Sequence, residues 1–421
     1  MIRALIFSTL YPNRAQPNHG VFVENRLRQT LALGGIEATV VAPVPWFPFG
    51  HPIFGSYATF AKVPLVETRH GLTVYHPRYP IIPKIGSRLT PRFLYRAARK
   101  MLSRIGGSWD LIDAHYFYPD GVAAAWLAQD LAIPLLITGR GTDLTLIPKS
   151  APHRAQIVWA SEQASAMITV CESLRHDLAG LGIAPERIAV LRNGVDLKRF
   201  SPGDRRGIRE KLDLPGFTLL SVGSLIPRKG HDLAIAAMAQ IADATLLIAG
   251  SGPLRASLEE LARNKGVASR VRFLGELAHD ELADVYRAAD IFVLASSREG
   301  WANVLLEAMA CGTPVVATDV NGTPEVLRDP KLGILVRERS SHALGAAIAE
   351  LRGRLPDRDQ VRTYAEQFSW ESTATANSKL FHAVAQQGYA GRAAPEILGT
   401  IQTLSHELTA RKSPVPPLTL F

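Results

Sequence analysis

The sequence is poor in cysteine, with Cys171 and Cys311 as its two cysteines in 421 residues. They stand far apart within apolar segments, so neither a disulfide framework nor a metal-ligand spacing is present. No uninterrupted apolar stretch reaches the length of a transmembrane helix. The first residues run directly into a strand-like pattern instead of the three-part pattern of a secretion signal. We therefore expect a cytoplasmic protein in a reducing compartment, without a bound metal or obligatory cofactor.

Acidic residues are also missing from one long interval, between Arg69 and Arg104. From Pro91 onward the basic residues share one helical face and apolar residues occupy the other, which suits the surface of an anionic membrane. A solvated helix packed on the core by its apolar stripe is the alternative. The basic residues within the interval are Arg78, Lys84, Arg88, Arg92, Arg96, Arg99 and Lys100.

The overall balance is that of a globular protein with an excess of positive charge. Hydrophobic residues make up 47% and charged residues 20%, and the net charge is +9. Such a charge suits nucleic acid, anionic lipid or anionic nucleotide substrates. The cations cluster beside apolar residues and no nucleic-acid reader motif is present, so we expect no nucleic-acid partner.

Short apolar runs alternate with segments of helical period along the whole chain, as in βαβ units with a buried parallel sheet. The length and this repetition predict an α/β protein with two Rossmann-like, doubly wound parallel-sheet domains. Strands are expected in the first half at residues 2–8, 38–42, 111–114, 134–138, 167–170 and 188–191. In the second half they are expected at residues 218–222, 245–249, 271–274, 291–294, 314–317 and 333–336.

Turn-forming residues between 193 and 203 end the first series of strands. We therefore place a first domain at 1–197 and a second at 198–365. A helix at about 366–390 is expected to pack back on the first domain. Residues 391–421, with a proline-rich end, are expected to form a flexible tail.

One segment of the second domain combines two carboxylates with a helix start. Glu299 follows a buried strand, Gly300 leads into a helix, and Glu307 stands about two turns later. In open α/β sheets ligands bind at this edge, where backbone N–H groups at a helix N-terminus favour an anion. The two carboxylates can thus contact different parts of one ligand, although either alone could be a solvated surface charge. The residues at the helix start that could contact such an anion are Gly300, Trp301, Ala302 and Asn303.

A second segment leaves the first strand of the same domain through Gly223 and presents Arg228 and Lys229 before a helix. Arginine offers a planar fork and lysine a compact charge, which together suit a pyrophosphate. A solvent-facing basic turn is the alternative interpretation.

The first domain has looser signals of the same kind. Gly20 stands at the mouth of a helix, where its amide could approach a phosphate, or where it could simply join a loop to a helix. His115 ends a strand, and Asp143 follows another strand in the segment Gly139-Arg140-Gly141-Thr142-Asp143.

Taken together, these segments resemble the retaining glycosyltransferases of family four over nearly the whole chain. The resemblance implies the GT-B fold, in which two Rossmann-like domains face a central cleft. The segment from Ser296 to Val316 is similar to that family's E-x7-E region, and the loop with Arg228 and Lys229 is similar to its phosphate loop. Arg140 departs from the pattern, because many members have histidine there, and this leaves the role of Asp143 open.

The resemblance implies roles for these residues. Glu307 would hold the donor ribose, Glu299 the hydroxyls of the donor sugar, and His115 the donor sugar as well. Arg228 and Lys229 would neutralise the leaving nucleoside diphosphate, which needs no metal ion. In this family the acceptor hydroxyl is described as attacking the anomeric carbon from the front face, with the leaving phosphate helping to take its proton. Such a reaction requires no nucleophile from the enzyme. The implied catalytic set is Glu299, His115, Arg228 and Lys229. The implied donor-binding set is Gly20, Asp143, Gly223, Arg228, Lys229, Glu299, Gly300, Trp301, Ala302, Asn303 and Glu307.

The leading function is therefore transfer of a sugar from a nucleotide sugar to a surface polysaccharide or a lipid-linked glycan. We expect the protein to associate peripherally with the inner face of the cytoplasmic membrane through residues 78–104. A GT-B epimerase, a soluble glucan or disaccharide synthase, and a non-catalytic scaffold are the alternatives. The paired glutamates disfavour the epimerase, and the intact donor segments disfavour the scaffold. The donor base, the donor sugar, the acceptor and the oligomeric state are not fixed by the sequence.

Overall fold

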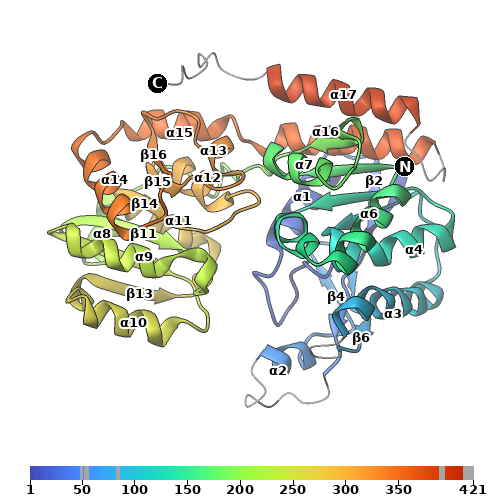
Figure 1. The fold of residues 1–421 in the computed structure, drawn as a ribbon, viewed down its shortest axis with the longest axis horizontal. Helices are drawn as coiled ribbons and strands as arrows, with labels where there is room; N and C mark the ends of the chain where they lie inside the picture. The colour runs from blue at the N-terminus through green and yellow to red at the C-terminus, as the bar shows by residue number, and fades with distance from the viewer. Residues whose placement is uncertain (48–50, 52–55, 82–85, 388–393, 411–421) are drawn as a thin grey trace. The chain divides into compact units, whose positions relative to one another are not determined.

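The computed structural model describes residues 1–47, 51, 56–81, 86–387 and 394–410. The chain divides into two compact units (Figure 1). Unit 1 combines Met1–Arg192 with Glu371–Phe421, and unit 2 is Asn193–Trp370. Among the helices that the structure describes, none has both the length and the apolar composition needed to span a lipid bilayer.

Unit 1 is built on an eight-stranded sheet in the order β10-β9-β8-β7-β1-β2-β5-β4. Neighbouring strands are parallel except in the β4–β5 hairpin. A separate parallel pair joins β3 to β6. The strands are β1 (Ile2–Phe7), β2 (Ile36–Val41), β3 (Val44–Pro45), β4 (Val66–Arg69), β5 (Leu72–Tyr75), β6 (Arg78–Tyr79), β7 (Leu111–His115), β8 (Leu135–Gly139), β9 (Ala166–Thr169) and β10 (Ile188–Val190).

The helices of unit 1 come from both ends of the chain, and the last of them follow unit 2 in the sequence (Figure 1). Their apolar stripes cover the sheet, so that Val23 and Leu27 of α1 share one core with Leu380 and Phe381 of α16. The helices are α1 (Val21–Leu31), α2 (Ser56–Ala61), α3 (Thr90–Ile105), α4 (Val122–Leu131), α5 (Thr142–Thr145), α6 (Ala151–Gln163), α7 (Glu172–Ala179), α16 (Trp370–Gln386) and α17 (Pro395–Ala410).

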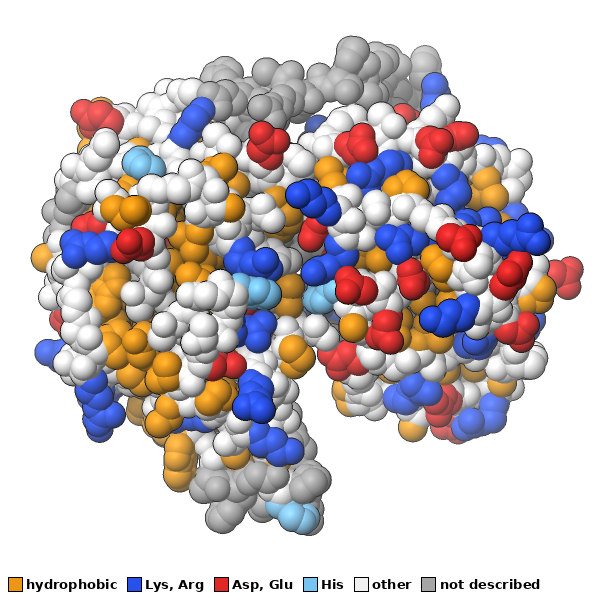
Figure 2. Space-filling model, turned by 180° about the vertical axis from the view of Figure 1, so that it is seen from behind, with side chains coloured by type: hydrophobic (Ala, Val, Ile, Leu, Met, Phe, Trp, Pro, Cys, Tyr) orange, Lys and Arg blue, Asp and Glu red, His pale blue; other side chains and the backbone are white. Residues whose placement is uncertain are grey.

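Unit 2 has a six-stranded sheet, all parallel, in the order β13-β12-β11-β14-β15-β16. Figure 2 shows basic and acidic side chains interspersed over the visible face of this unit. The strands are β11 (Phe217–Val222), β12 (Ala244–Ala249), β13 (Val271–Gly275), β14 (Ile291–Leu294), β15 (Val315–Thr318) and β16 (Gly333–Val336). The helices are α8 (Arg205–Lys211), α9 (His231–Ala237), α10 (Arg255–Asn264), α11 (His279–Ala288), α12 (Asn303–Ala310), α13 (Thr323–Val326), α14 (Ser341–Gly353) and α15 (Arg358–Glu366).

The predicted α/β class with two parallel-sheet domains is confirmed, and each strand expected from the sequence is present within two residues of its predicted bounds. The hairpin of β4 and β5 and the short pair of β3 and β6 were not predicted. These strands are two to four residues long, and Glu67 and Arg69 interrupt the apolar pattern of β4. Strands of this length leave no periodic signal in a sequence.

The predicted flexible tail is wrong for most of its described part, because α17 occupies Pro395–Ala410. Ile397, Ile401 and Leu404 are at most 2% exposed and pack in the core of unit 1. Their spacing of four and three residues is that of one helical face, a signal that the proline-rich end obscured. Residues 411–421 and Lys84 lie outside the described residues.

The division between the units lies before Asn193, ahead of the boundary predicted after Leu197. Residues 193–195 belong to unit 2 because they run beside its last residues. The Val195 amide donates to the Phe368 carbonyl at 2.9 Å, and a Cβ on Gly194 would lie 2.5 Å from the Trp370 nitrogen. The first and last segments of unit 2 therefore close against each other.

Candidate functional site

Glu299 is the centre of the polar cluster that follows β14 in unit 2. The residue is 8% exposed, and its Oε1 accepts hydrogen bonds from Lys229 Nζ at 2.6 Å and from Ser296 Oγ at 2.7 Å. Arg228 lies 3.3 Å from the other oxygen, Oε2. Burial alone raises the pKa of Glu299, but Lys229 and Arg228 outweigh it and lower this pKa below its usual value. Glu299 is therefore an ionised carboxylate shared by two cations.

The loop from Gly223 to Gly230 places both cations. Gly223 has a φ of +150°, and a Cβ there would lie 3.2 Å from Lys229 Cδ and Cε. At Gly230, with a φ of +69°, a Cβ would lie 2.1 Å from the Ala295 carbonyl oxygen. Glycine is thus needed at both positions, once for the path of the lysine side chain and once for close backbone packing. The Ser297 amide also donates to the Arg228 carbonyl at 2.8 Å, which ties this loop to the one after β14.

Glu307 lies on α12 and is half-buried. Its Oε2 accepts a hydrogen bond from the Tyr286 hydroxyl at 3.0 Å. Burial raises the pKa of Glu307 to about 7, against the opposing effects of Tyr286, Lys229 and Arg199. The carboxylate therefore titrates near neutral pH, in contrast to Glu299.

The residues at the start of α12 differ in their burial and in their hydrogen bonds. Trp301 is 7% exposed, and its Nε1 donates to the Asn193 carbonyl at 3.0 Å. Asn303 Oδ1 accepts from the Asn193 side-chain amide at 3.3 Å, and Ala302 is 2% exposed. The Trp301 and Asn303 side chains hold the first residue of unit 2, an anchoring contact that the sequence did not indicate. Beside them Gly300 remains partly exposed.

Three supporting residues were not found from the sequence. They are Ser296 and Tyr286, described above, and His231. His231 Nδ1 accepts a hydrogen bond from the Ser221 hydroxyl at 3.0 Å, and its Nε2 lies 3.2 Å from the Gly223 carbonyl oxygen. Burial lowers the pKa of His231 to about 4, so the ring is neutral and braces the Gly223 loop. Tyr286 and Glu307 are 21 positions apart in the chain, and Ser221 and His231 are 10 apart, so no local pattern revealed these two contacts.

In unit 1, His115 is 1% exposed at the end of β7. Its Nε2 lies 3.1 Å from Asp113 Oδ2, and its Nδ1 accepts from Arg140 at 2.5 Å. Burial and the neighbouring Arg140 lower the pKa of His115, although Asp113 opposes them. The ring is thus a neutral imidazole held between the Asp113 carboxylate and the Arg140 guanidinium.

Asp143 is held by the backbone amides of its own loop. The side chain is fully buried, and its oxygens accept from the backbone amides of Gly141 at 2.7 Å, Phe117 at 2.9 Å and Arg140 at 3.0 Å. This carboxylate is covered from solvent and organises its own loop through these three amides. Its contact with a donor stays a prediction.

Gly20 caps α1 with a φ of +70°. A Cβ there would lie 2.3 Å from the Leu10 carbonyl oxygen, so the glycine allows the loop after β1 to fold tightly against the helix start. Both a phosphate-binding role and a purely structural role for Gly20 were open from the sequence. This close contact gives the structural reason for a glycine at this position.

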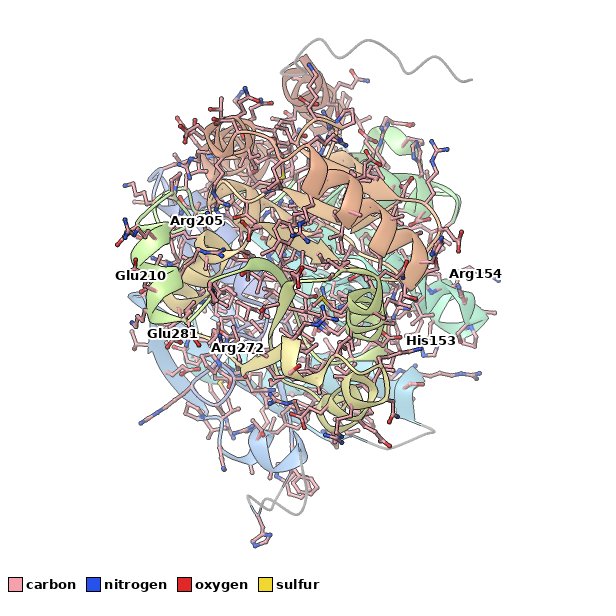
Figure 3. All side chains as sticks on the ribbon, turned by 90° about the vertical axis from the view of Figure 1, so that its left-hand side faces the viewer. His153, Arg154, Arg205, Glu210, Arg272 and Glu281 are labelled. Atoms are coloured by element: carbon pink, nitrogen blue, oxygen red, sulfur yellow. The ribbon has the colours of Figure 1, made fainter. Side chains whose placement is uncertain are left out.

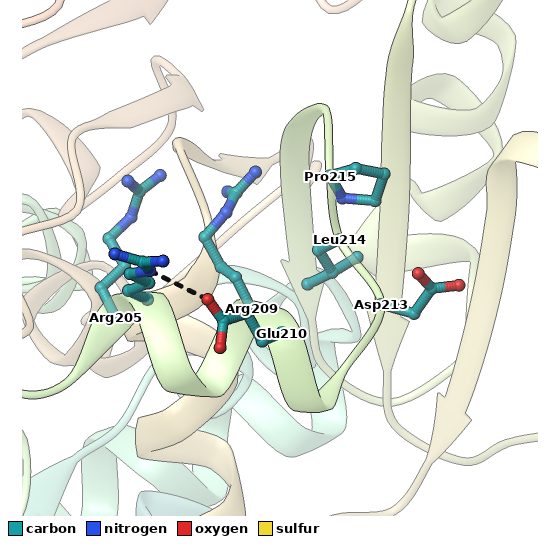
Figure 4. A pocket seen from close by; sticks show the side chains of 7 residues that line it. Arg205, Arg209, Glu210, Asp213, Leu214 and Pro215 are labelled. Atoms are coloured by element: carbon teal, nitrogen blue, oxygen red, sulfur yellow. Dashed lines mark hydrogen bonds and ion pairs between the residues drawn. The ribbon is translucent and has the colours of Figure 1, made fainter.

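A separate hollow of about 580 Å³ lies beside α8, lined by Arg205, Arg206, Arg209, Glu210, Asp213, Leu214 and Pro215 (Figure 4). Figure 3 shows Arg205 and Glu210 along this helix. The three arginines are paired with acids: Arg205 and Arg209 with Asp290, and Arg206 with Glu210. The arginines that line the hollow are therefore held in ion pairs, and the lining residues form no catalytic arrangement.

Within the described part of the chain, no group of three or more His, Cys, Asp or Glu side chains is placed to hold a metal ion.

Comparison with known proteins identifies relatives over both units. Residues 25–199 match the family described as Glycosyltransferase Family 4, and residues 204–368 match Glycosyl transferases group 1. A D-inositol 3-phosphate glycosyltransferase of Geodermatophilus obscurus is 33% identical over 355 residues, which cover 77% of this chain and 78% of that protein. The protein of the same name from Mycobacterium tuberculosis is 36% identical over 301 residues, which cover 64% of this chain and 61% of its own length.

Solved structures share the fold at lower identity. Sucrose-phosphate synthase from Thermosynechococcus elongatus has a TM-score of 0.74 and 23% identity, covering 91% of this chain and 98% of the other. Anabaena Alr3699/HepE in complex with UDP-glucose has a TM-score of 0.63 and 20% identity, covering 97% and 100%. At these identities the likeness concerns the fold.

Proposed function

This chain belongs to glycosyltransferase family 4, and from that premise we propose that it moves a sugar from a nucleotide-sugar donor to an acceptor hydroxyl with retention at the anomeric carbon. It is a glycosyltransferase of the GT-B type. The acceptor that we propose is a cell-surface polysaccharide or a lipid-linked glycan. We assign the donor to unit 2 and the acceptor to unit 1.

The observation that carries this proposal is the cluster of Arg228, Lys229 and Glu299. Two cations face one ionised carboxylate, so the cluster keeps a net positive charge in a half-buried setting. Diphosphate oxygens would satisfy that charge through charge-assisted hydrogen bonds. Glu307 of α12, seven residues beyond Gly300 in the sequence, supplies a second carboxylate for the ribose hydroxyls. HepE, a neighbour of the same fold, was solved with UDP-glucose.

The proposed chemistry follows from this charge. The bond from the anomeric carbon to the diphosphate oxygen breaks, and the acceptor oxygen bonds to the same face of that carbon. The acceptor proton passes to the leaving phosphate. Arg228 and Lys229 stabilise the negative charge as it grows on the leaving group, which lowers the barrier without a metal ion. Glu299 is neutralised by both cations and is suited to hold sugar hydroxyls.

The test of the donor site is thermal stabilisation by UDP, GDP, ADP and their sugar conjugates, with and without EDTA. A ligand that binds the native state raises stability by mass action. We expect a rise for one base, unchanged by EDTA, and lost in Glu307→Ala and in Arg228→Ala/Lys229→Ala. Glu210→Ala, on the exposed face of α8, is the matched control and should keep the rise. No rise with any nucleotide in the folded protein would overturn the donor assignment.

Peripheral membrane association is proposed from α3 and the strands beside it. Arg92, Arg96, Lys100 and Arg104 are exposed on α3, and only Arg99 of this face is seen paired, 3.2 Å from Asp130, among the described residues. Several exposed apolar side chains precede α3 in the sequence, between Trp46 and Leu89. They are Trp46, Leu65, Val66, Ile81 and Leu89. A basic face with apolar side chains suits an anionic lipid surface.

Vesicle sedimentation tests this association. We expect binding to vesicles with anionic phosphatidylglycerol and weaker binding of Arg96→Glu/Lys100→Glu, because each cation near such a surface contributes about 1 kcal/mol. Arg206→Glu, which changes an exposed arginine of unit 2, should bind like the unchanged protein. Equal binding to neutral and anionic vesicles would contradict the proposal.

A small soluble acceptor is the second candidate, favoured by the relative of 33% identity that is named for D-inositol 3-phosphate. The Arg140–His115 contact would supply a cation for such an anionic acceptor. Release of nucleoside diphosphate from the preferred nucleotide sugar, stimulated by D-inositol 3-phosphate and not by lipid extract, would select this candidate.

A further inference from the structure

Tyr286 is fixed in the interior of unit 2 with its hydroxyl directed at Glu307. The side chain is fully buried on α11, and the hydroxyl donates to Glu307 Oε2 at 3.0 Å. The ring packs edge-on against Phe292 and Phe200 at centroid distances of 5.5 and 5.9 Å. The Thr313 hydroxyl also donates to the Tyr286 carbonyl at 2.6 Å. The position of the phenol is therefore set by packing that does not involve the carboxylate.

The charged groups that influence Glu307 have stronger partners elsewhere. Lys229 lies 2.6 Å from Glu299, and Arg199 lies 3.3 Å from Asp280. Both lower the pKa of Glu307 from a distance, without a hydrogen bond to it in the described residues. Cys311, on the next turn of α12, remains a neutral thiol because burial raises its pKa to about 12. Tyr286 is thus the group whose hydrogen bond directly favours the ionised carboxylate.

We propose that Tyr286 is a positioning residue for nucleotide binding, which holds one oxygen of Glu307 so that the ionised carboxylate can offer the other oxygen, Oε1, to the ribose. This inference rests on the proposed function of Glu307. An ionised carboxylate accepts two hydroxyl hydrogen bonds, whereas a carboxylic acid must donate with one oxygen. Tyr286 consequently sets the pH range in which the donor binds well.

The direction of the pH effect follows from the hydrogen bond. The pKa of Glu307 is already raised to about 7 by burial, against the effect of the Tyr286 hydroxyl. Without that hydroxyl the pKa rises further, and a larger fraction of Glu307 is protonated at neutral pH. The defect of a Tyr286→Phe variant should therefore be large near neutral pH and decrease as the pH is raised.

The experiment measures the dissociation constant of UDP-glucose, GDP-mannose or ADP-glucose, whichever stabilises the protein most, between about pH 6 and pH 9. The phosphates of such diesters do not titrate in this range. For Tyr286→Phe we expect about tenfold weaker binding at pH 7, the scale of one hydrogen bond to a charged group, and nearly unchanged binding at pH 9. Tyr364→Phe is the matched control, because its hydroxyl donates to the Val326 carbonyl at 2.8 Å in the same unit.

The outcomes separate the inference from the proposed function. If Glu307→Gln binds the nucleotide sugar as well as the unchanged protein does, Glu307 does not hold the ribose and the donor assignment itself fails. If Glu307→Gln weakens binding and Tyr286→Phe matches the unchanged protein at every pH, the role of Tyr286 is wrong. An equal loss for Tyr286→Phe at every pH would also overturn it, since a purely structural defect has no reason to follow the ionisation of Glu307.

Discussion

Lys229 is bound to a buried carboxylate, and this pairing governs how the residue responds to substitution. Its ammonium is 2.6 Å from Glu299, and the side chains of Lys229 and Glu299 are 13% and 9% exposed. Of the groups that lower the pKa of Glu299 against burial, Lys229 is the strongest. An ionised acid with a lowered pKa stabilises the folded protein above its unfolded-state pKa, and this contribution disappears as the pH falls through the folded-state value.

Replacing Lys229 with methionine should therefore destabilise the protein in a pH-dependent way. Arg228 remains as a partner, so we expect a loss of about 2 kcal/mol in the free energy of unfolding near pH 7.5. The loss should shrink toward about pH 4.5, where Glu299 can take up a proton in the variant. Urea unfolding at the two pH values measures it, with the exposed Lys211→Met as control. A loss that does not change with pH would show that the pairing is not its source.

At the scale of elements, Asp290 joins α8 to the sheet of unit 2. The carboxylate stands just before β14, is 15% exposed as a side chain and is paired with Arg205 and Arg209 of α8. It also accepts from the Thr218 amide at the start of β11 at 2.7 Å. Arg272 of β13 donates a hydrogen bond to the Leu212 carbonyl at the end of the helix, at 2.7 Å. A short helix is thus held by polar contacts, since none of its residues is buried.

Asp290→Ala should destabilise unit 2 by about 3 kcal/mol, because two partly buried arginines and a backbone amide lose their shared acceptor. Asp290→Asn keeps an oxygen for Thr218 and should lose less. Glu210→Ala breaks only the exposed pair with Arg206, whose side chains are 65% and 91% exposed, and should change stability by less than about 0.5 kcal/mol. Urea unfolding compares the three variants, and equal losses would contradict the role of Asp290.

At the scale of the whole molecule, the chain leaves unit 1 and later returns to complete it. The helices α16 and α17 follow unit 2 in the sequence, yet they supply Leu380, Phe381 and Ile401 to the core of unit 1. The stability of unit 1 therefore depends on the last described residues, whereas the core of unit 2 is built from residues of unit 2 itself.

Ile401→Asp tests this arrangement, because Ile401 is 2% exposed. Placing a charge there should cost more than about 3 kcal/mol, while Gln402→Asp on the exposed neighbour should cost less than about 0.5 kcal/mol. Limited proteolysis with mass spectrometry should show early cleavage in unit 1 of Ile401→Asp and a protected fragment containing unit 2. Equal protection of both units in the two variants would mean that α17 is dispensable for unit 1.

Much of the fold and the main elements of the candidate site were predictable from the sequence. Buried parallel strands are continuous apolar runs, and the alternation with helical period repeats in both halves, so the strands and the two-domain α/β class follow from local pattern. Glu299, Glu307, Arg228 and Lys229 were recognisable because their spacing about a strand end and a helix start is local as well. Such features are fixed by residues that are close together in the chain.

The tertiary structure decided what depends on distant residues. It placed α17 in the core of unit 1, filled the oxygens of Asp143 with loop amides and put the Tyr286 hydroxyl on Glu307. Whether a carboxylate is an ionised ligand, a loop brace or a group that titrates near neutral pH depends on burial and on neighbours brought in by packing. The sequence by itself determined which residues could take part in the chemistry, and packing determined the state of each.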